Sequence, residues 1–333
     1  MRRFLTTVMI GLFLVGGGWA LVNRDKLKSA DDLMKLAGEQ ISRLKSKFSA
    51  PARLVGWSQP QSHAGVIRIA TFNIQAFGPT KAANAEVMQY LAEICRHFDI
   101  IAIQEIRGQD RTLLPQFVSR INSGGGSYGF VVSPPLGREN YREQAGFIYN
   151  QDVVQLDNAY AYTVNDPDDV MIREPFVGWF RTTQVAAEQA FTFSLVNLHL
   201  DSRRGTTEIG YLQELFRLVR SDGRGEDDVL LIGDFNLGER TLERAGKKSG
   251  LAPVLRDTAT NTRGNNHYDN ILLDVRATSE FTGQSGAFDF LRQFNLTVEQ
   301  AMLISDHLPV WAEFSVQEGG AIRQARNASE ATR

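Results

Sequence analysis

Short apolar and β-branched runs, separated by loops, recur from about residue 66 to residue 316 of the chain. Nine of these runs have the length and composition of β-strands: VIRIATFNI, FDIIAIQE, YGFVVS, AGFIYN, VGWFRT, FTFSLVNLHL, DVLLIGDFN, YDNILLD and LPVWAEF. Helical spacing of apolar residues appears between them, in NAEVMQYLAEICRHF, TLLPQFVSRI and TEIGYLQELFRLVR. Because strand and helix patterns alternate, the sequence predicts an α/β fold with mixed sheets.

The two ends of the chain have different patterns. After Arg2 and Arg3 no charged residue occurs from residue 4 to residue 22, which predicts an export signal or a membrane anchor over residues 1–24. Residues 25–65 are expected to form an amphipathic helical stalk and a linker. We expect the main domain over residues 66–316 and a disordered tail over residues 317–333. The pattern predicts a protein exported from the cytoplasm and leaves open whether the first segment is cleaved.

The composition limits the partners of the chain. Apolar residues make up 43% and charged residues 22%, which is typical of a soluble globular domain. The formal net charge of −2 argues against extensive electrostatic wrapping of nucleic acid, so any such contact should be compact. The single cysteine, Cys95, has no partner for an internal disulfide and is expected to pack in the core.

Polar residues occur where many of the predicted strands end or begin. These residues are Asn73, Glu105, His199, Asp234, Asn236, Asp269, Asp306 and His307. A single Asn or Asp at a strand end is most often a turn former, but six such ends in one chain favour a shared site at the rim of the sheets. The acidic and amide oxygens suit Mg²⁺, Mn²⁺ or Ca²⁺ better than zinc, and histidines beside carboxylates can transfer protons. These are the parts needed to cleave a phosphodiester.

Several motifs in these segments resemble a known family. FNI, QE, GDFN and SDHLP resemble motifs of the endonuclease/exonuclease/phosphatase superfamily. SPPLGRENYRE and REPF resemble the narrower segments with which the deoxyribonuclease I branch grips the phosphates beside the cut. The resemblance covers nearly the whole main domain. It implies a deoxyribonuclease-I-like fold, a four-layer sandwich of two packed mixed β-sheets flanked by helices.

The resemblance also implies catalytic roles. His199 would act as the general acid and pair with Glu143, while His307 would act as the general base and pair with Asp269. The pairing is physically sound, because a carboxylate beside an imidazole sets its tautomer and stabilises its protonated form. Asp234 and Asn236 would orient the scissile phosphate or the attacking water.

Metal and substrate contacts follow from the same resemblance. The ligands of Mg²⁺ or Mn²⁺ would be Asn73, Glu105 and Asp306. The residues in contact with DNA would be Arg107, Tyr141 and Arg173. The segment RDTATNTRGNN resembles the loop that binds structural Ca²⁺ in the family, but it is one residue longer, so Ca²⁺ ligation by Asp257, Thr260 or Thr262 stays open.

Three functions remain open at this stage. The first is a metal-dependent endonuclease that hydrolyses DNA, and the second is another phosphodiesterase or phosphatase of the superfamily, acting on a phospholipid or sugar phosphate. The third is a binding module without catalytic activity, which is disfavoured because every matched catalytic position carries a competent residue. The expected partners are DNA and, through an uncleaved first segment, a membrane. The sequence implies no protein partner.

Overall fold

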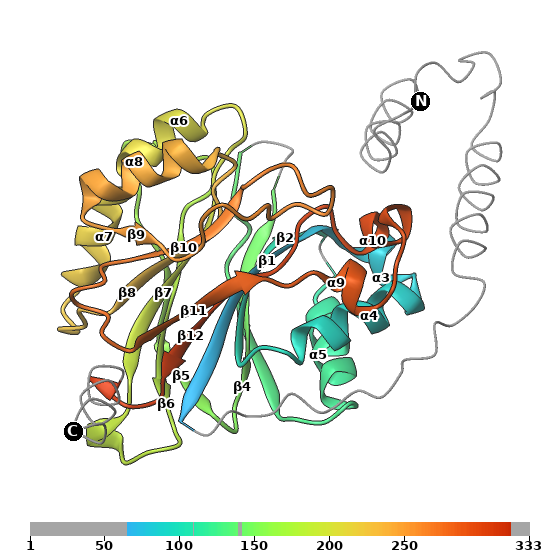
Figure 1. The fold of residues 1–333 in the computed structure, drawn as a ribbon, viewed down its shortest axis with the longest axis horizontal. Coiled ribbons are helices and arrows are strands. Elements are labelled where there is room, and N and C mark those ends of the chain that lie inside the picture. Colours follow the sequence, from blue (N-terminus) through green and yellow to red (C-terminus); the bar gives the residue numbers. More distant parts are fainter. Residues whose placement is uncertain (1–64, 109, 139–141, 321–333) are drawn as a thin grey trace, which may run out of the picture. The chain divides into compact units, whose positions relative to one another are not determined.

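The computed structural model describes residues 65–108, 110–138 and 142–320. In this part of the chain two six-stranded sheets pack against each other, and helices cover their outer faces (Figure 1). Both sheets are mixed, because each contains one parallel pair among antiparallel pairs. The predicted four-layer architecture is therefore confirmed.

The first sheet has the strand order β11-β12-β1-β2-β4-β3. Its strands are β1 (Val66–Phe77), β2 (Ile100–Ile106), β3 (Tyr128–Val132), β4 (Gln144–Asn150), β11 (Phe281–Ala287) and β12 (Val310–Ser315). Strand β1 runs parallel to β2 and antiparallel to β12. The end of β1, the end of β2 and the start of β12 therefore lie at the same edge of the sheet.

The second sheet has the strand order β5-β6-β7-β8-β10-β9. Its strands are β5 (Val154–Thr163), β6 (Phe176–Thr182), β7 (Thr192–His199), β8 (Val229–Asp234), β9 (Ala252–Pro253) and β10 (Asp269–Leu273). Strand β8 pairs in parallel with β7 and antiparallel with β10. In this register His199 and Asp269 both lie opposite Asp234, so three of the predicted site residues are adjacent on neighbouring strands.

Two groups of helices flank the sheets (Figure 1). On the side of the first sheet are α3 (Pro79–Ala82), α4 (Ala85–Cys95), α5 (Leu113–Asn122), α9 (Phe290–Gln293) and α10 (Val298–Ile304). On the side of the second are α6 (Gly205–Glu208), α7 (Leu212–Arg220) and α8 (Glu239–Ser249). A 3-10 turn, η3 (Ile209–Tyr211), connects α6 to α7, and another, η2 (Ala187–Gln189), lies between β6 and β7. Helix α4 begins after Asn84 because the side chain of this residue accepts hydrogen bonds from two amides of the first turn. Cys95 at the end of α4 is buried, as predicted.

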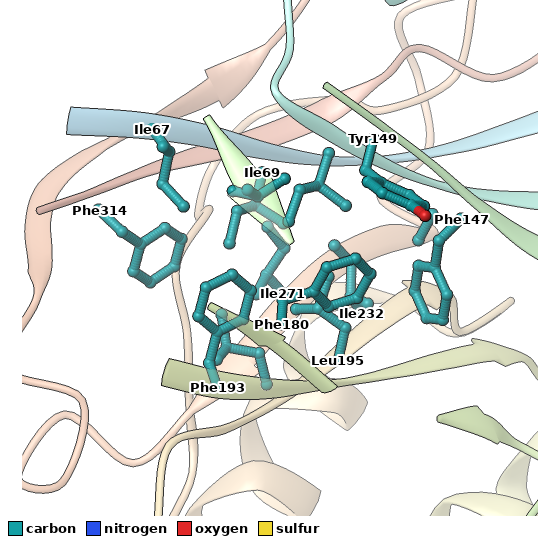
Figure 2. Close-up of a cluster of buried hydrophobic side chains, with 14 of the residues drawn as sticks. Ile67, Ile69, Phe147, Tyr149, Phe180, Phe193, Leu195, Ile232, Ile271 and Phe314 are labelled. Carbon is teal, nitrogen blue, oxygen red and sulfur yellow. The ribbon is translucent and has the colours of Figure 1, made fainter. Parts of the chain in front are cut away.

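The core between the sheets consists of alternate residues from the strands of both sheets (Figure 2). The ring of Phe180 packs 5.5 Å from that of Phe147 and 5.8 Å from that of Phe193, measured between ring centroids. Ile69 and Ile271 lie in the same cluster and are fully buried. Burial of such side chains stabilises the sandwich by about 1.5–3 kcal/mol for each one.

A buried polar bridge crosses this core below the strand ends. The side-chain amide of Asn197, on β7, donates to the carbonyl oxygens of Ile103 (3.1 Å) and Gly146 (3.0 Å) in the first sheet. Gln104 donates in turn to Asn197 Oδ1 at 2.7 Å. These bonds satisfy polar groups that no water reaches, and they set how one sheet lies on the other.

The sequence patterns missed some elements for identifiable reasons. All nine predicted strands are present, but β5, β9 and β11 were not predicted. Strand β11 has the sequence FTGQSGA, contains no apolar run and lies at the sheet edge. Helix α8 was also missed, because only Leu242 and Gly246 of its eleven residues are buried and the apolar period is too weak to detect.

The predicted export segment, the stalk and nearly all of the tail lie outside the described residues. No helix within the described ranges is long and apolar enough to cross a membrane. The predicted domain limits at residues 66 and 316 stay predictions.

Replacement of Asn197 by Leu tests the polar bridge. The variant keeps the side-chain volume but leaves Gln104 and two buried carbonyl groups without their partner, so we expect a loss of about 2–4 kcal/mol in the free energy of unfolding. Urea denaturation followed by circular dichroism measures this loss. The control is Gln155→Leu, which removes an exposed amide from β5 and should cost less than about 0.5 kcal/mol. Equal stability of the two variants would contradict a structural role for the bridge.

Candidate active site

Two histidine–carboxylate pairs meet at the edge where the two sheets come together. His199 ends β7 of the second sheet, and its Nδ1 lies 2.5 Å from Oε1 of Glu143, which precedes β4 of the first sheet. His307 precedes β12 of the first sheet, and its Nδ1 lies 2.9 Å from Oδ2 of Asp269, which begins β10 of the second. Each pair therefore joins one sheet to the other.

Asp234 lies between the two imidazoles. Its Oδ2 is 3.6 Å from Nε2 of His199 and 3.7 Å from Nε2 of His307. The carboxylate is 1% exposed, and it accepts hydrogen bonds from the amide groups of Asn73 (3.0 Å) and Asn236 (3.2 Å) and from the backbone N–H of Asn236 (2.8 Å). The outer nitrogens of both histidines thus face one point at the end of β8.

The first pair is held by Arg173. Its Nε lies 3.0 Å from Oε1 of Glu143, and its Nη1 donates to the backbone carbonyl of His199 at 3.2 Å. Burial opposes ionisation of Glu143, but the charges of His199 and Arg173 outweigh it and lower the pKa of this carboxyl group. Burial likewise acts against protonation of His199, yet Glu143 raises the pKa of the imidazole above its ordinary value. His199 therefore carries a proton more readily than a free histidine does.

The second pair, His307 and Asp269, is supported by the hydroxyl group of Thr260. Thr260 Oγ1 donates to Asp269 Oδ2 at 2.8 Å, the same oxygen that faces His307. Burial acts to lower the pKa of His307, but Asp269, Asp234 and Asp306 outweigh it and raise the pKa well above its ordinary value. The carboxylates around His307 therefore favour its protonated form.

The three predicted metal ligands lie beside these pairs. Asn73 Nδ2 contacts Glu105 Oε1 at 3.4 Å, and Glu105 Oε2 accepts a hydrogen bond from the backbone N–H of Ala76 at 2.7 Å. Asp306 Oδ1 lies 3.9 Å from His307 Nε2, is buried and has no hydrogen-bond partner among the described residues. Glu105 adopts a left-handed backbone conformation with φ of 61°, which costs a residue with a side chain of order 1–3 kcal/mol.

The donor set fits a hard divalent cation. It consists of carboxylate and amide oxygens, which Mg²⁺ and Mn²⁺ prefer, and Asp306 provides a buried oxygen to which no described group donates a hydrogen bond. A second group of ligand atoms, from Asp234, Asp269 and His307, lies within 4.8 Å of one another. Its members bond to each other or to the asparagines, while in the predicted ligand group Glu105 is paired with Arg107 and Asp306 keeps a buried oxygen without a hydrogen-bond partner among the described residues.

The sequence patterns missed three polar residues that hold this site. The ammonium group of Lys81 donates to the carbonyl oxygens of Ile74 (2.8 Å) and Ile304 (2.6 Å), next to Asn73 and near Asp306 in the chain. Burial lowers its pKa to about 7, and the charges of Asp306 and Glu105 oppose that change. Lys81 therefore ties the end of β1 to the end of α10.

Ser305 and Thr260 are the other two residues. Ser305 Oγ donates to the carbonyl oxygen of Asn73 at 2.6 Å and accepts from the backbone N–H of His307 at 3.0 Å, while Thr260 supports Asp269. Ser305 stands in the SDHLP motif, and the family resemblance suggested Thr260 only as a Ca²⁺ ligand, not as the partner of Asp269 nine residues further on. The contact of Lys81 with Ile304 joins segments far apart in the chain.

The predicted substrate residues have different surroundings. Arg107 forms an ion pair of 2.6 Å with Glu105, one of the predicted metal ligands, and is partly exposed. Arg173 is 8% exposed and engaged with Glu143, so it lies directly behind the first pair. Tyr141 lies outside the described residues.

The loop proposed for Ca²⁺ has internal partners. Thr262 Oγ1 donates to the carbonyl oxygen of Ser305 at 2.7 Å, and Thr260 Oγ1 is bonded to Asp269. The backbone N–H of Asp257 donates to Glu239 at 2.8 Å. The two threonine contacts tie the loop to the segments that carry His307 and Asp269, and structural Ca²⁺ at this place stays a prediction.

Two packed mixed sheets carry paired imidazoles and carboxylates at one rim, an arrangement that can transfer protons to and from a substrate. A profile described as the Endonuclease/Exonuclease/phosphatase family matches residues 70–307. The chain belongs to this family, as its motifs predicted.

Named relatives and solved structures are similar over most of the chain. "Deoxyribonuclease gamma" of Mus musculus is 31% identical over 277 residues, which covers 78% of this chain and 87% of the relative. "Deoxyribonuclease-1-like 1" of Sus scrofa is 35% identical over 267 residues, with 76% and 82% covered. The structure of an endonuclease/exonuclease/phosphatase family protein from Leptotrichia buccalis gives a TM-score of 0.52 at 15% identity, covers 75% of this chain and 99% of its own, and supports the fold.

The pKa of His307 tests the second pair. In Asp269→Asn the pKa of His307 should fall, because the largest favourable charge beside the imidazole is removed. Histidine chemical shifts followed by NMR as a function of pH measure the change. The control is Asp274→Asn, at the far end of β10, which should leave the His307 titration where it is in the unsubstituted protein. An unchanged His307 pKa in Asp269→Asn would refute the electrostatic pairing.

Proposed function

We propose that this protein is a divalent-metal-dependent endonuclease that hydrolyses phosphodiester bonds of DNA. The observation that carries the proposal is the placement of the outer nitrogens of His199 and His307, 3.6 and 3.7 Å from one oxygen of Asp234. Two imidazoles that face one point can serve opposite proton transfers on one phosphate group. The relatives named as deoxyribonucleases support DNA as the substrate.

Glu105 and Asp306, assisted by Asn73, would hold Mg²⁺ or Mn²⁺. A bound cation of this kind neutralises charge on a phosphate oxygen and stabilises the leaving oxygen. Lys81 and Ser305 support this group from behind, because they fix the backbone segments that carry Asn73 and Asp306. The ligands are therefore positioned before a substrate arrives.

The two histidines divide the proton transfers. His307, oriented by Asp269, takes a proton from the attacking water at Nε2 as the P–O bond forms. His199, oriented by Glu143, gives a proton from Nε2 to the oxygen that leaves as the second P–O bond breaks. Asp234 and Asn236 orient the phosphate or the water between them. The raised pKa of His199 suits the acid role, since the group is protonated before the reaction.

The contact with DNA is proposed to be compact. Arg107 is the predicted substrate residue that remains partly exposed at the metal ligands, and its planar guanidinium can hold two phosphate oxygens. The slightly negative net charge of the chain is consistent with a grip on a few phosphates next to the cut.

A lipid substrate has less support. An enzyme that works on a bilayer surface needs an exposed apolar patch. Within the described ranges the exposed large hydrophobic residues are Tyr160, Val275 and Val298, and these come from three separate segments. DNA is therefore preferred over a phospholipid headgroup.

We also propose that the enzyme acts outside the cytoplasm. The uncharged run that follows Arg2 and Arg3 supports export. A fusion of residues 1–30 to a reporter enzyme that is active only after export tests this proposal. Reporter activity at the level of a fusion without the segment would count against it.

Nicking of supercoiled plasmid tests the nuclease proposal. The full-length protein should convert the plasmid to the open circle with Mg²⁺ or Mn²⁺ and not with EDTA. His199→Ala and His307→Ala should each lower the initial rate by about 10²–10⁴-fold, the usual contribution of general acid–base catalysis.

The matched control is His97→Gln. This histidine stacks on Phe288, with 4.5 Å between ring centroids, and belongs to the helix side of the first sheet. Its replacement should leave the nicking rate within about twofold. If the folded protein leaves the plasmid intact with every metal tested, DNA is not its substrate. If His199→Ala, His307→Ala and His97→Gln all nick at the same rate, His199 and His307 have no catalytic role.

The pH dependence of nicking tests the role of His307 as general base. His307 must be neutral to accept a proton, and its pKa is raised, so the rate should rise with pH through a value above that of an ordinary histidine. In Asp269→Asn this rising limb should move to lower pH, with a lower maximum rate. Initial rates between pH 5 and pH 9 at saturating metal measure the limb, and a limb that Asp269→Asn does not move would contradict the assignment.

A further inference from the structure

Three carboxylates meet at the far end of β8 from the candidate active site. Asp228 immediately precedes β8, whose other end is Asp234. Glu280 precedes β11, and Glu318 follows β12. One carboxylate oxygen from each of the three comes within 4.8 Å of the other two. We call this group the second acidic cluster.

Two of the three carboxylates are deeply buried and incompletely bonded. Asp228 is 2% exposed; its Oδ1 has no hydrogen-bond partner among the described residues, and the nearby Thr278 hydroxyl acts to lower the pKa of its carboxyl group. Glu280 is 0% exposed; its Oε1 accepts from Ser279 Oγ at 3.1 Å and from the backbone N–H of Gly319, while its Oε2 has no partner. A buried carboxylate oxygen without a donor costs about 1–3 kcal/mol, or more where it is charged. A bound cation would therefore stabilise Asp228 Oδ1 and Glu280 Oε2.

The cluster is also short of positive charge. Burial, and then the neighbouring acids, raise the pKa of Asp228 to about 8 and that of Glu318 to about 7. No described cation is among the groups that shift either pKa. Arg224 lines the adjoining pocket together with Glu318, but its guanidinium is paired with Asp222 and lies over the ring of Tyr160. Within the described residues, the groups that offset this repulsion are neutral hydrogen-bond donors: Thr278 beside Asp228 and the backbone of Thr192 beside Glu318.

We propose that Asp228, Glu280 and Glu318 form a second cation site, which takes a hard divalent cation of the Ca²⁺ type. The ligands are all oxygens, and Ca²⁺ accepts irregular carboxylate sets that Mg²⁺, with its strict octahedral geometry, does not. Glu318 is exposed at the open pocket lined also by Trp179 and Glu226, so an ion can enter from solvent. The site is separate from the predicted catalytic metal ligands and from the threonine-rich loop.

The cation would connect the two sheets. Asp228 leads into the second sheet, while Glu280 and Glu318 flank strands of the first. An ion held by all three would stabilise the folded protein and not the unfolded chain, where the residues are apart. The role is structural, so it stands whether or not the nuclease proposal does.

Thermal unfolding of the full-length protein tests the site. Ca²⁺ added after EDTA treatment should raise the Tm by several degrees, because it binds the folded state alone. Glu318→Gln and Asp228→Asn should lose most of this increase. In EDTA, Asp228→Asn should be about as stable as the unsubstituted protein at neutral pH, because the raised pKa already keeps most of this carboxyl group uncharged.

Two controls separate this site from other acidic groups. Glu188→Gln removes an exposed carboxylate from the same pocket and should keep the full Ca²⁺ response. Asp306→Asn removes a predicted catalytic ligand and should also keep it. Glu318 is exposed, so its variant gives a result even where Asp228→Asn fails to fold.

Terbium provides a direct reading of binding. Trp179 Nε1 donates to Glu226 at 2.9 Å, and Trp179 lines the same pocket as Glu318, so its indole can serve as the energy donor for bound Tb³⁺. Tb³⁺ luminescence should appear with the unsubstituted protein and be at least tenfold weaker with Glu318→Gln. Added Ca²⁺ should displace Tb³⁺ and abolish the signal. The proposal is overturned where Ca²⁺ leaves the Tm unchanged, or where Glu318→Gln and Asp228→Asn keep the full shift and the full Tb³⁺ signal.

Discussion

The buried carboxylate of Asp234 is the constraint on which the candidate active site depends. A carboxylate at 1% exposure persists in a protein only where hydrogen bonds and positive groups replace its water. Asn73 from the first sheet and Asn236 from the second supply those hydrogen bonds, and the two imidazoles face the same oxygen. Solvation of one group therefore needs side chains from both sheets, and it brings their ends together.

Each histidine pair reinforces this arrangement, because its imidazole and its carboxylate come from different sheets. A change in the way the sheets pack would move His199 away from Glu143 and His307 away from Asp269 at once. The buried bridge around Asn197 lies beneath these pairs and resists such a change. The apolar core supplies most of the packing energy, while the polar contacts select one alignment among those the core would accept.

A buried acidic residue stands at each end of β8, Asp234 at one and Asp228 at the other, and the two have different surroundings. At Asp234 the protein itself supplies amides and imidazoles, so the carboxylate is fully bonded. At Asp228 the neighbours are further carboxylates, and some of their oxygens have no hydrogen-bond donor among the described residues. The first environment suits proton transfer on a substrate, and the second suits a bound cation.

The sequence by itself determined the family, the nine main strands and the residues at their ends, because strand periodicity and short motifs are local properties of the chain. It did not reveal β11 or α8, whose residues bury too little apolar surface to leave a pattern. Only the tertiary structure decided that Lys81 ties β1 to α10 and that the outer nitrogens of both histidines face Asp234. Those contacts join segments more than thirty residues apart, and their geometry follows from the packing of the sheets, which no local pattern encodes.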